Sequence, residues 1–319
     1  MSIVVVGSVA FDAIETPFGQ RDKILGGSAT HFSLAASFFT DVKVIAVVGA
    51  DFGPSEEAVF HARHIDISGI ERVPDGKTFF WSGLYGYDLN DRVTRATELN
   101  VFADFKPKLD EAACRAPYLF LGNIHPRLQL DVKRQMVGPR LVALDTMNYW
   151  IERTREELLA VLREIDVLII NDAEARQLTG EPNLVKAAQQ IRQWGPKTLV
   201  IKRGEYGAVM FDNGEFFVAP GLPLETVFDP TGAGDSFAGG FLGYLAAIGH
   251  VDTVALRRAV IYGSVMASFC VEAFGCERLC ALTYDDINAR FRQFKQLVQF
   301  EDSEFQRPTG TAIGVTLAE

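Results

Sequence analysis

The sequence contains few cysteines, four among 319 residues. So sparse a set cannot form the disulfide framework of a small secreted protein, and it is typical of a chain that folds in a reducing compartment. Cys276 and Cys280 have no second Cys or His pair at the spacing of a zinc site, so we expect structural thiols. The first residues lack a basic segment and carry Asp12 within their apolar stretch, unlike a secretion signal. We therefore expect a cytoplasmic protein.

Long apolar runs and an excess of positive charge are also missing. No run approaches the roughly 18 apolar residues of a membrane span, so we expect no membrane association. Lys and Arg total 31 against 41 Asp and Glu, which leaves a formal charge of −10. This negative charge repels a phosphate backbone and argues against general nucleic-acid binding. The composition that remains, 48% hydrophobic and 23% charged, is typical of a globular protein.

Short runs rich in Val, Ile and Leu recur along most of the chain, and helical patterns separate them. Continuous apolar runs are typical of strands covered on both faces, and their alternation with helices indicates a parallel sheet between two helical layers. The predicted strands are 3–7, 43–49, 118–123, 141–146, 167–173 and 198–204. The predicted helices are 28–39, 54–63, 126–136, 152–164 and 183–194. The predicted fold class is therefore α/β with a mainly parallel central sheet.

Two segments depart from this alternation. Residues 67–104 contain several strand-like runs and no helical pattern, so we predict antiparallel strands that stand apart from the main sheet as a lid. Residues 207–219 carry Asp212-Asn213-Gly214 between two apolar runs, which predicts a β-hairpin. The chain has no internal repeat or linker, and this favours one domain with a protruding lid.

The most informative segment is the string DPTGAGDSFAGGF at 229–241. Gly232 and Gly234 allow backbone N–H groups to converge without obstruction by side chains. A buried helix is predicted to follow, and its first turn would direct N–H groups and partial positive charge at the loop. Such a loop suits developing negative charge, for example a phosphoryl group during transfer, with Asp235 able to accept a proton. A glycine-rich turn capped by Asp235 is the alternative.

This string resembles the C-terminal signature of the ribokinase family, also called the PfkB carbohydrate kinase family. Other landmarks of that family occur in the expected order between residue 3 and about residue 300. Gly26-Gly27 matches the N-terminal signature, 171–174 matches an N-x-x-E motif, and 202–207 resembles a strand-end G-x-x-G segment. The resemblance implies a ribokinase-like three-layer sandwich with a small β-sheet lid. It divides the chain into one kinase domain at 1–300, with the lid inserted at about 11–25 and 67–104, and a C-terminal tail at 301–319.

The resemblance also implies roles for the matching residues in phosphoryl transfer from ATP. Asp235 would be the base, and the N–H groups of Gly232, Ala233 and Gly234 would form the anion hole. The residues implied in nucleotide binding are Asn171, Glu174, Lys202, Gly204, Gly207 and Thr231. Asn171 and Glu174 would also hold Mg²⁺ through water molecules. Asp229 would take part in a site for a monovalent cation such as K⁺.

The acceptor site implied by the resemblance lies near the N-terminus. Asp12, Gly26 and Gly27 would hold the hydroxyl groups of the acceptor. His31 would join them, at a position where the sugar kinases usually have Asn. The form GGSATHFSLAAS at 26–37 is more similar to the branches that contain nucleoside and inositol kinases.

Together these features predict an ATP-dependent kinase that phosphorylates a hydroxyl group of a small-molecule sugar. The alternative on the same fold is a nucleoside kinase, cytidine- or adenosine-like, or an inositol kinase; outside the enzymes it is a catalytically silent binding protein. In a nucleoside kinase, lid aromatics such as Phe79, Trp81 and Tyr85 would stack on the base. The same aromatics would otherwise serve lid packing or a homodimer through the lid. A dinucleotide-dependent dehydrogenase is disfavoured because no GxGxxG follows the first strand.

Overall fold

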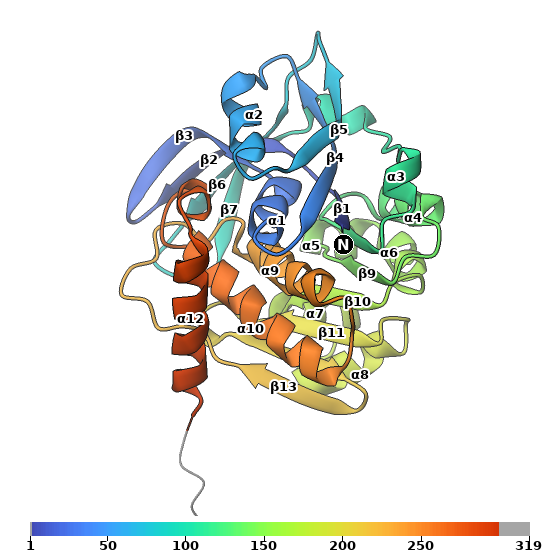
Figure 1. Ribbon diagram of the computed structural model, residues 1–319, viewed down its shortest axis with the longest axis vertical. Coiled ribbons are helices and arrows are strands. Elements are labelled where there is room, and N and C mark those ends of the chain that lie inside the picture. The colour runs from blue at the N-terminus through green and yellow to red at the C-terminus, as the bar shows by residue number, and fades with distance from the viewer. Residues whose placement is uncertain (1, 300–319) are drawn as a thin grey trace, which may run out of the picture.

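The structure, a computed structural model, describes residues 2–299, and its larger β-sheet has nine strands (Figure 1). In spatial order these are β13 (Glu215–Ala219), β12 (Ala208–Asp212), β11 (Thr198–Lys202), β10 (Val167–Asn171), β9 (Leu141–Leu144), β8 (Tyr118–Leu121), β1 (Ser2–Val6), β4 (Asp41–Gly49) and β5 (Asp66–Val73). β12 pairs antiparallel with β13, as the predicted hairpin requires, and also antiparallel with β11; the other neighbours pair parallel. The predicted mainly parallel α/β sheet is confirmed.

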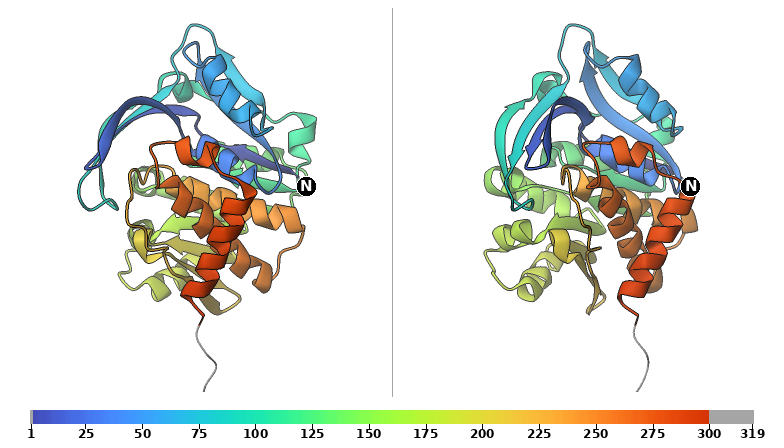
Figure 2. Two further views of the ribbon diagram at one scale, coloured as in Figure 1. Left: turned by 60° about the vertical axis from the view of Figure 1, so that its left-hand side comes forward. Right: turned by 90° about the vertical axis from the view of Figure 1, so that its left-hand side faces the viewer.

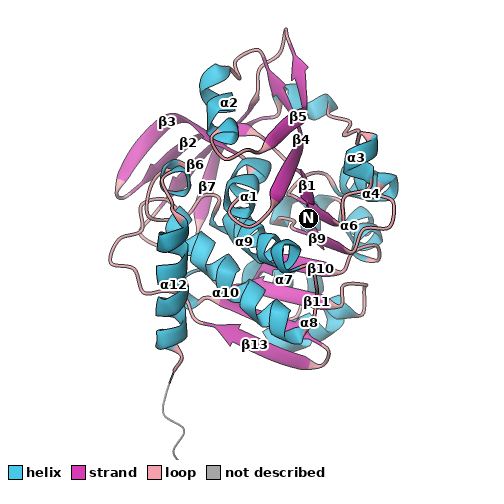
Figure 3. Ribbon diagram, viewed as in Figure 1, coloured by secondary structure: helices cyan, strands magenta, loops and turns pink. Residues whose placement is uncertain are grey.

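Helices cover both faces of this sheet, which explains its continuous apolar strands (Figure 3). One face carries α1 (Ser28–Ala36), α2 (Pro54–His61), α9 (Ala233–Ile248), α10 (Thr253–Cys270), α11 (Glu277–Cys280) and α12 (Tyr284–Leu297). The other carries α3 (Glu111–Cys114), α4 (Pro126–Gln135), α5 (Asn148–Arg153), α6 (Arg155–Leu162), α7 (Asp172–Thr179) and α8 (Leu184–Arg192). Alternate residues of β1 enter the two cores, Ile3 and Val5 on one side and Val4 and Val6 on the other. The chain is therefore a three-layer sandwich.

A separate four-stranded sheet stands to one side of the main sheet (Figure 2). Its strands, in spatial order, are β3 (Gly19–Gly26), β2 (Ala10–Thr16), β6 (Phe79–Tyr85) and β7 (Arg92–Glu98). β2 pairs with β6 in parallel, although some 60 residues of chain, including β4 and β5, lie between them. We call this four-stranded sheet the lid sheet.

Three sequence predictions need correction. The segment 67–73 was predicted to stand apart, but β5 pairs in parallel with β4 at the edge of the main sheet, because α2 connects the two strands as a βαβ unit. The run after β7 is not a strand: a 3₁₀ helix, η1 (Asn100–Asp104), begins where Asn100 has a φ of 49°. The helix predicted over 152–164 is divided at Thr154 into α5 and α6.

Within residues 2–299, no helix combines the length and the hydropathy needed to cross a lipid bilayer. The predicted tail at 301–319 lies outside the described residues.

Candidate active site

The loop that begins the buried helix α9 has the backbone geometry expected of an anion hole. Gly232 caps the helix in the left-handed conformation, with a φ of 77°. The carboxylate of Asp229 is buried and accepts hydrogen bonds from the N–H of Thr231 at 2.8 Å and of Gly275 at 2.9 Å. Asp229 therefore shapes the loop and ties it to the segment before α11.

Not every predicted N–H group of this loop is available to a ligand. The N–H of Ala233 donates to the carbonyl of Pro230 at 3.2 Å. Gly234 and Asp235 lie in the first turn of α9, where N–H groups have no partner within the helix. These residues are partly exposed, so a ligand can approach the start of α9.

Asp235 lies in an acidic environment at the start of α9. Burial raises the pKa of its carboxyl to about 7; the Asp145 carboxylate adds to this rise, and the Lys202 ammonium opposes it. A carboxylate with a pKa near neutrality can accept a proton from a hydroxyl and release it afterwards.

The carboxyl ends of three neighbouring strands supply the rest of the polar cluster. Asp145 follows β9, Asn171 ends β10 and Lys202 ends β11. The Lys202 ammonium donates to Oδ2 of Asp145 at 3.0 Å. Oδ1 of Asp145 accepts the N–H of Thr146 at 2.8 Å, and the buried Thr146 hydroxyl has no partner among the described residues. This is the edge of the sheet at which open α/β folds bind ligands.

Asn171 and Glu174 form a capping box at the start of α7. Oδ1 of Asn171 accepts the N–H of Glu174 at 2.7 Å, and Oε2 of Glu174 accepts the N–H of Asn171 at 2.8 Å. Burial raises the pKa of Glu174, and the negative charge of Asp145 adds to this effect. The side-chain oxygen of Asn171 and one oxygen of Glu174 are thus engaged in the helix cap, and the second oxygen of Glu174 takes no part in it.

The two glycines after β11 shape the turn η2 (Gly204–Tyr206) that follows it. Gly204 and Gly207 have φ values of 55° and 86°, which favour glycine. A methyl group on Gly204 would overlap the side chain of Asn90, which lies between β6 and β7 of the lid sheet. The tip of that hairpin therefore contacts the end of β11.

Asp12 lies within β2 of the lid sheet, the next strand after β1. Its side chain is 5% exposed and lies so close to Gly26 that a methyl group on this glycine would overlap the carboxylate. Burial raises the pKa of Asp12 to about 8, the charges of Asp229 and Asp235 raise it further, and a hydrogen bond from the Gly27 N–H lowers it. The structure thus brings Asp12 and the two glycines of the N-terminal motif to the α9 loop.

His31 lies behind that loop and is 1% exposed. A methyl group on Gly232 would overlap its imidazole ring, and the sulfur atoms of Cys270 and Cys276 each lie 3.8 Å from Nδ1. Burial lowers the pKa of His31 to about 4, so the ring is neutral at physiological pH. In this structure His31 supports the loop from behind.

Two lid residues that reach the site complete the arrangement. The hydroxyl of Tyr85, at the end of β6, lies 3.1 Å from that of Thr231. Arg92, at the start of β7, is close enough for its charge to lower the pKa of Asp235 and Glu174. Sequence reasoning missed Arg92 and Asp145. Asp145 could have been found, because it lies near the end of a predicted strand, as Asn171 and Lys202 do.

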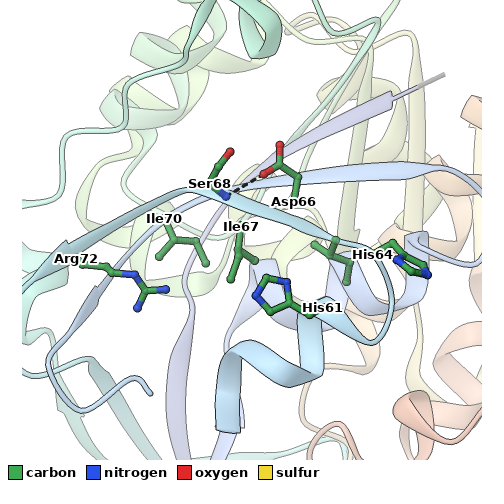
Figure 4. A pocket seen from close by; sticks show the side chains of 8 residues that line it. His61, His64, Asp66, Ile67, Ser68, Ile70 and Arg72 are labelled. Carbon is green, nitrogen blue, oxygen red and sulfur yellow. Dashed lines mark hydrogen bonds between the residues drawn. The ribbon is translucent and has the colours of Figure 1, made fainter. Parts of the chain in front are cut away.

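A surface pocket elsewhere contains none of these residues (Figure 4). It is lined by His61, His64 and side chains of β5, including Asp66 and Arg72. His61 is the last residue of α2, whereas His64 follows the helix with a φ of 54°, so the two histidines do not share a helical face.

Comparison with known proteins gives consistent results. Residues 133–282 match the family model described as pfkB family carbohydrate kinase. The chain is 32% identical to a cytidine kinase of Thermococcus kodakarensis over 76% of this chain and 87% of that protein. It is 30% identical to a ribokinase of Haemophilus influenzae over 86% of this chain and 94% of that protein.

A solved structure shows the same fold. The nucleoside kinase of Burkholderia thailandensis in complex with inosine superposes with a TM-score of 0.75 and 21% identity, over 91% of this chain and 98% of that one. The predicted ribokinase-like sandwich with a small additional sheet is confirmed.

Proposed function

This chain belongs to the PfkB carbohydrate kinase family and is a phosphotransferase with an alcohol acceptor, and we propose that Asp235 is the base that activates the acceptor hydroxyl. The acceptor oxygen attacks the γ-phosphorus of ATP, the bond to the oxygen of ADP breaks, and the hydroxyl proton passes to Asp235. The N–H groups at the start of α9 stabilise the negative charge on the phosphoryl group.

One observation carries this proposal. Asp12, on the lid sheet, and Asp235, at the start of α9, are close enough for the charge of one to raise the pKa of the other. An acceptor held by Asp12, Gly26 and Gly27 therefore lies beside both the base and the anion-binding loop. Tyr85 bonds to Thr231 across the same space, which supports a lid that excludes water during transfer.

The residues around Asp145 fit a magnesium ion. Three carboxylates, those of Asp145, Glu174 and Asp235, lie near one ammonium group; burial raises the pKa of Glu174 and Asp235, and repulsion from Asp145 raises it further. Such an excess of negative charge suits a hydrated divalent cation. Mg²⁺ would be held through water by Asn171, Glu174 and Asp145, and it would neutralise charge on the phosphate oxygens. A monovalent cation near Asp229 and a homodimer through the lid stay predictions.

The acceptor is a small molecule that carries a sugar ring, because Asp12 and the backbone at Gly26-Gly27 suit a pair of neighbouring hydroxyl groups. Among such molecules a free sugar is the first candidate and a nucleoside is the second. It is favoured by the similarity to the cytidine kinase of T. kodakarensis and by Trp81, an aromatic ring on the lid sheet that packs beside Tyr85. A free sugar requires no such ring.

The experiment is an ADP-release assay with Mg-ATP against free pentoses and hexoses, inositol, cytidine, adenosine and inosine. We expect one compound that carries a sugar ring to be phosphorylated, and Asp235→Asn to reduce its turnover by about a thousandfold while ATP binding changes only a few-fold. Asp75→Asn, in the exposed turn after β5, is the matched control and should keep full turnover. An Asp235→Asn variant with more than about a tenth of wild-type turnover would exclude this residue as the base.

A further inference from the structure

The ammonium group of Lys202 lies between a carboxylate and the anion-binding loop. On one side it donates to Oδ2 of Asp145 at 3.0 Å. On the other side, a methyl group added to Gly234 would lie 2.7 Å from Nζ, so the ammonium directly faces the backbone at the start of α9. Its side chain is 18% exposed, so the protein does not enclose it completely.

A purely structural role explains this ion pair poorly. Asp145 and Lys202 follow β9 and β11, and β10 lies between these strands with its own hydrogen-bond ladders to both. The sheet therefore needs no ion pair to hold the two strand ends together. Removing both charges from water is costly, and buried ion pairs contribute little net stability.

The surrounding charges favour a ligand that carries negative charge at this point. Lys202 makes a single hydrogen bond among the described residues, to Asp145, although an ammonium group has three N–H donors. Burial acts to lower the pKa of Lys202, but Asp145, Glu174 and Asp235 raise it, with a net upward shift, so the group keeps its positive charge. A compact ammonium beside backbone N–H groups is well suited to phosphate oxygens.

We propose that Lys202 is a catalytic residue that donates hydrogen bonds to the phosphoryl group during its transfer, and that Asp145 is a positioning residue that holds the ammonium beside Gly234. This inference rests on the proposed kinase activity. Lys202 keeps its proton throughout, since the proton of the acceptor goes to Asp235. Its contribution is attraction to oxygens whose charge is greatest in the transition state.

The test uses nucleotide binding as well as turnover, because ATP and ADP differ by the γ-phosphate that Lys202 would contact. Binding of ATP and of ADP is measured by calorimetry on the full chain without divalent cation, and turnover is measured with Mg-ATP and the best acceptor. We expect Lys202→Met to lower kcat by about 10²–10³. It should also reduce the preference for ATP over ADP by about tenfold, whereas Lys202→Arg keeps the preference and part of kcat.

Two further variants separate positioning from structure. Asp145→Asn should lower kcat but keep the preference for ATP, because the ammonium remains present and is only less well placed. Lys43→Met is the matched control. Lys43 lies near the start of β4, where it pairs with Asp66 and Asp110, whereas the site lies at the carboxyl ends of the strands, so kcat and the affinities for ATP and ADP should stay at wild-type values. If Lys202→Met does not fold, Lys202→Gln, which can still donate to Asp145, replaces it.

The outcomes are distinct. If a folded Lys202→Met or Lys202→Gln keeps the ATP preference and a kcat within about threefold of wild type, Lys202 is a structural ion-pair partner and the inference is wrong. If wild-type protein phosphorylates no acceptor, the proposed function fails. The binding comparison still tests the contact between Lys202 and the γ-phosphate in that case, because it needs no acceptor.

Discussion

Gly232→Ala tests whether His31 supports the catalytic loop from behind. The substitution adds one methyl group to a residue with a φ of 77°, and that methyl group would overlap the imidazole of His31. The ring cannot withdraw easily, because Cys270 and Cys276 lie against it. Gly138→Ala is the matched control, since Gly138 has a φ of 61° but no atom within 4 Å of an added methyl group.

The expected magnitudes follow from this difference. A left-handed conformation costs an alanine about 1–2 kcal/mol, and this cost applies to both variants. Overpacking a buried site costs about 1–3 kcal/mol, and it applies to Gly232→Ala alone. We therefore expect the free energy of unfolding to fall by about 2–5 kcal/mol in Gly232→Ala and by about 1–2 kcal/mol in Gly138→Ala.

Urea denaturation of the two variants measures these losses, and kinase assays accompany it. Gly138→Ala should keep full activity, whereas Gly232→Ala should lose most of kcat because its loop must move. His31→Ala should lower the free energy of unfolding of the wild type, because it leaves a cavity. The same substitution should lower it less in the Gly232→Ala background, and the difference, which is the coupling energy, should be about 1 kcal/mol or more. Equal losses in the two glycine variants, together with additive effects of His31→Ala, would show that the ring does not press on the loop.

Three other predictions concern the acceptor, the base and the lid. Asp12→Ala should raise the acceptor KM about tenfold or more; an unchanged KM would place the acceptor elsewhere. Burial raises the pKa of Asp235 to about 7, and the base must be ionised to accept a proton. We therefore expect kcat to fall as the pH drops below about 7 and to level off above it. A pH–rate profile that is flat from about pH 5.5 to 8 would contradict this. Tyr85→Phe removes the contact with Thr231 and should raise ATP hydrolysis relative to acceptor phosphorylation, whereas Tyr87→Phe, whose side chain is exposed, should not; equal ratios in both would exclude this lid contact.

The amino-acid sequence alone determined the local elements and the chemistry of the loop. β1 and β10 are runs of buried Val, Leu and Ile, because strands covered on both faces need apolar side chains throughout. Asn213-Gly214 marks the hairpin, since both residues adopt the positive φ values of its turn. The string at 229–241 was recognisable because its glycines, its acidic residue and the helix that follows are contiguous in the chain.

Only the tertiary structure decided which distant residues meet. β5 lies in the segment that the sequence predicted as lid strands, but the βαβ connection through α2 places it in the main sheet. Lys202 and Asp145 are 57 residues apart and Tyr85 and Thr231 are 146 apart, and each pair meets because strand ends or sheets are brought together by the packing of the whole chain. Local patterns report which face of a strand or helix is buried, whereas strand order and the approach of the lid depend on long-range contacts that no local pattern records.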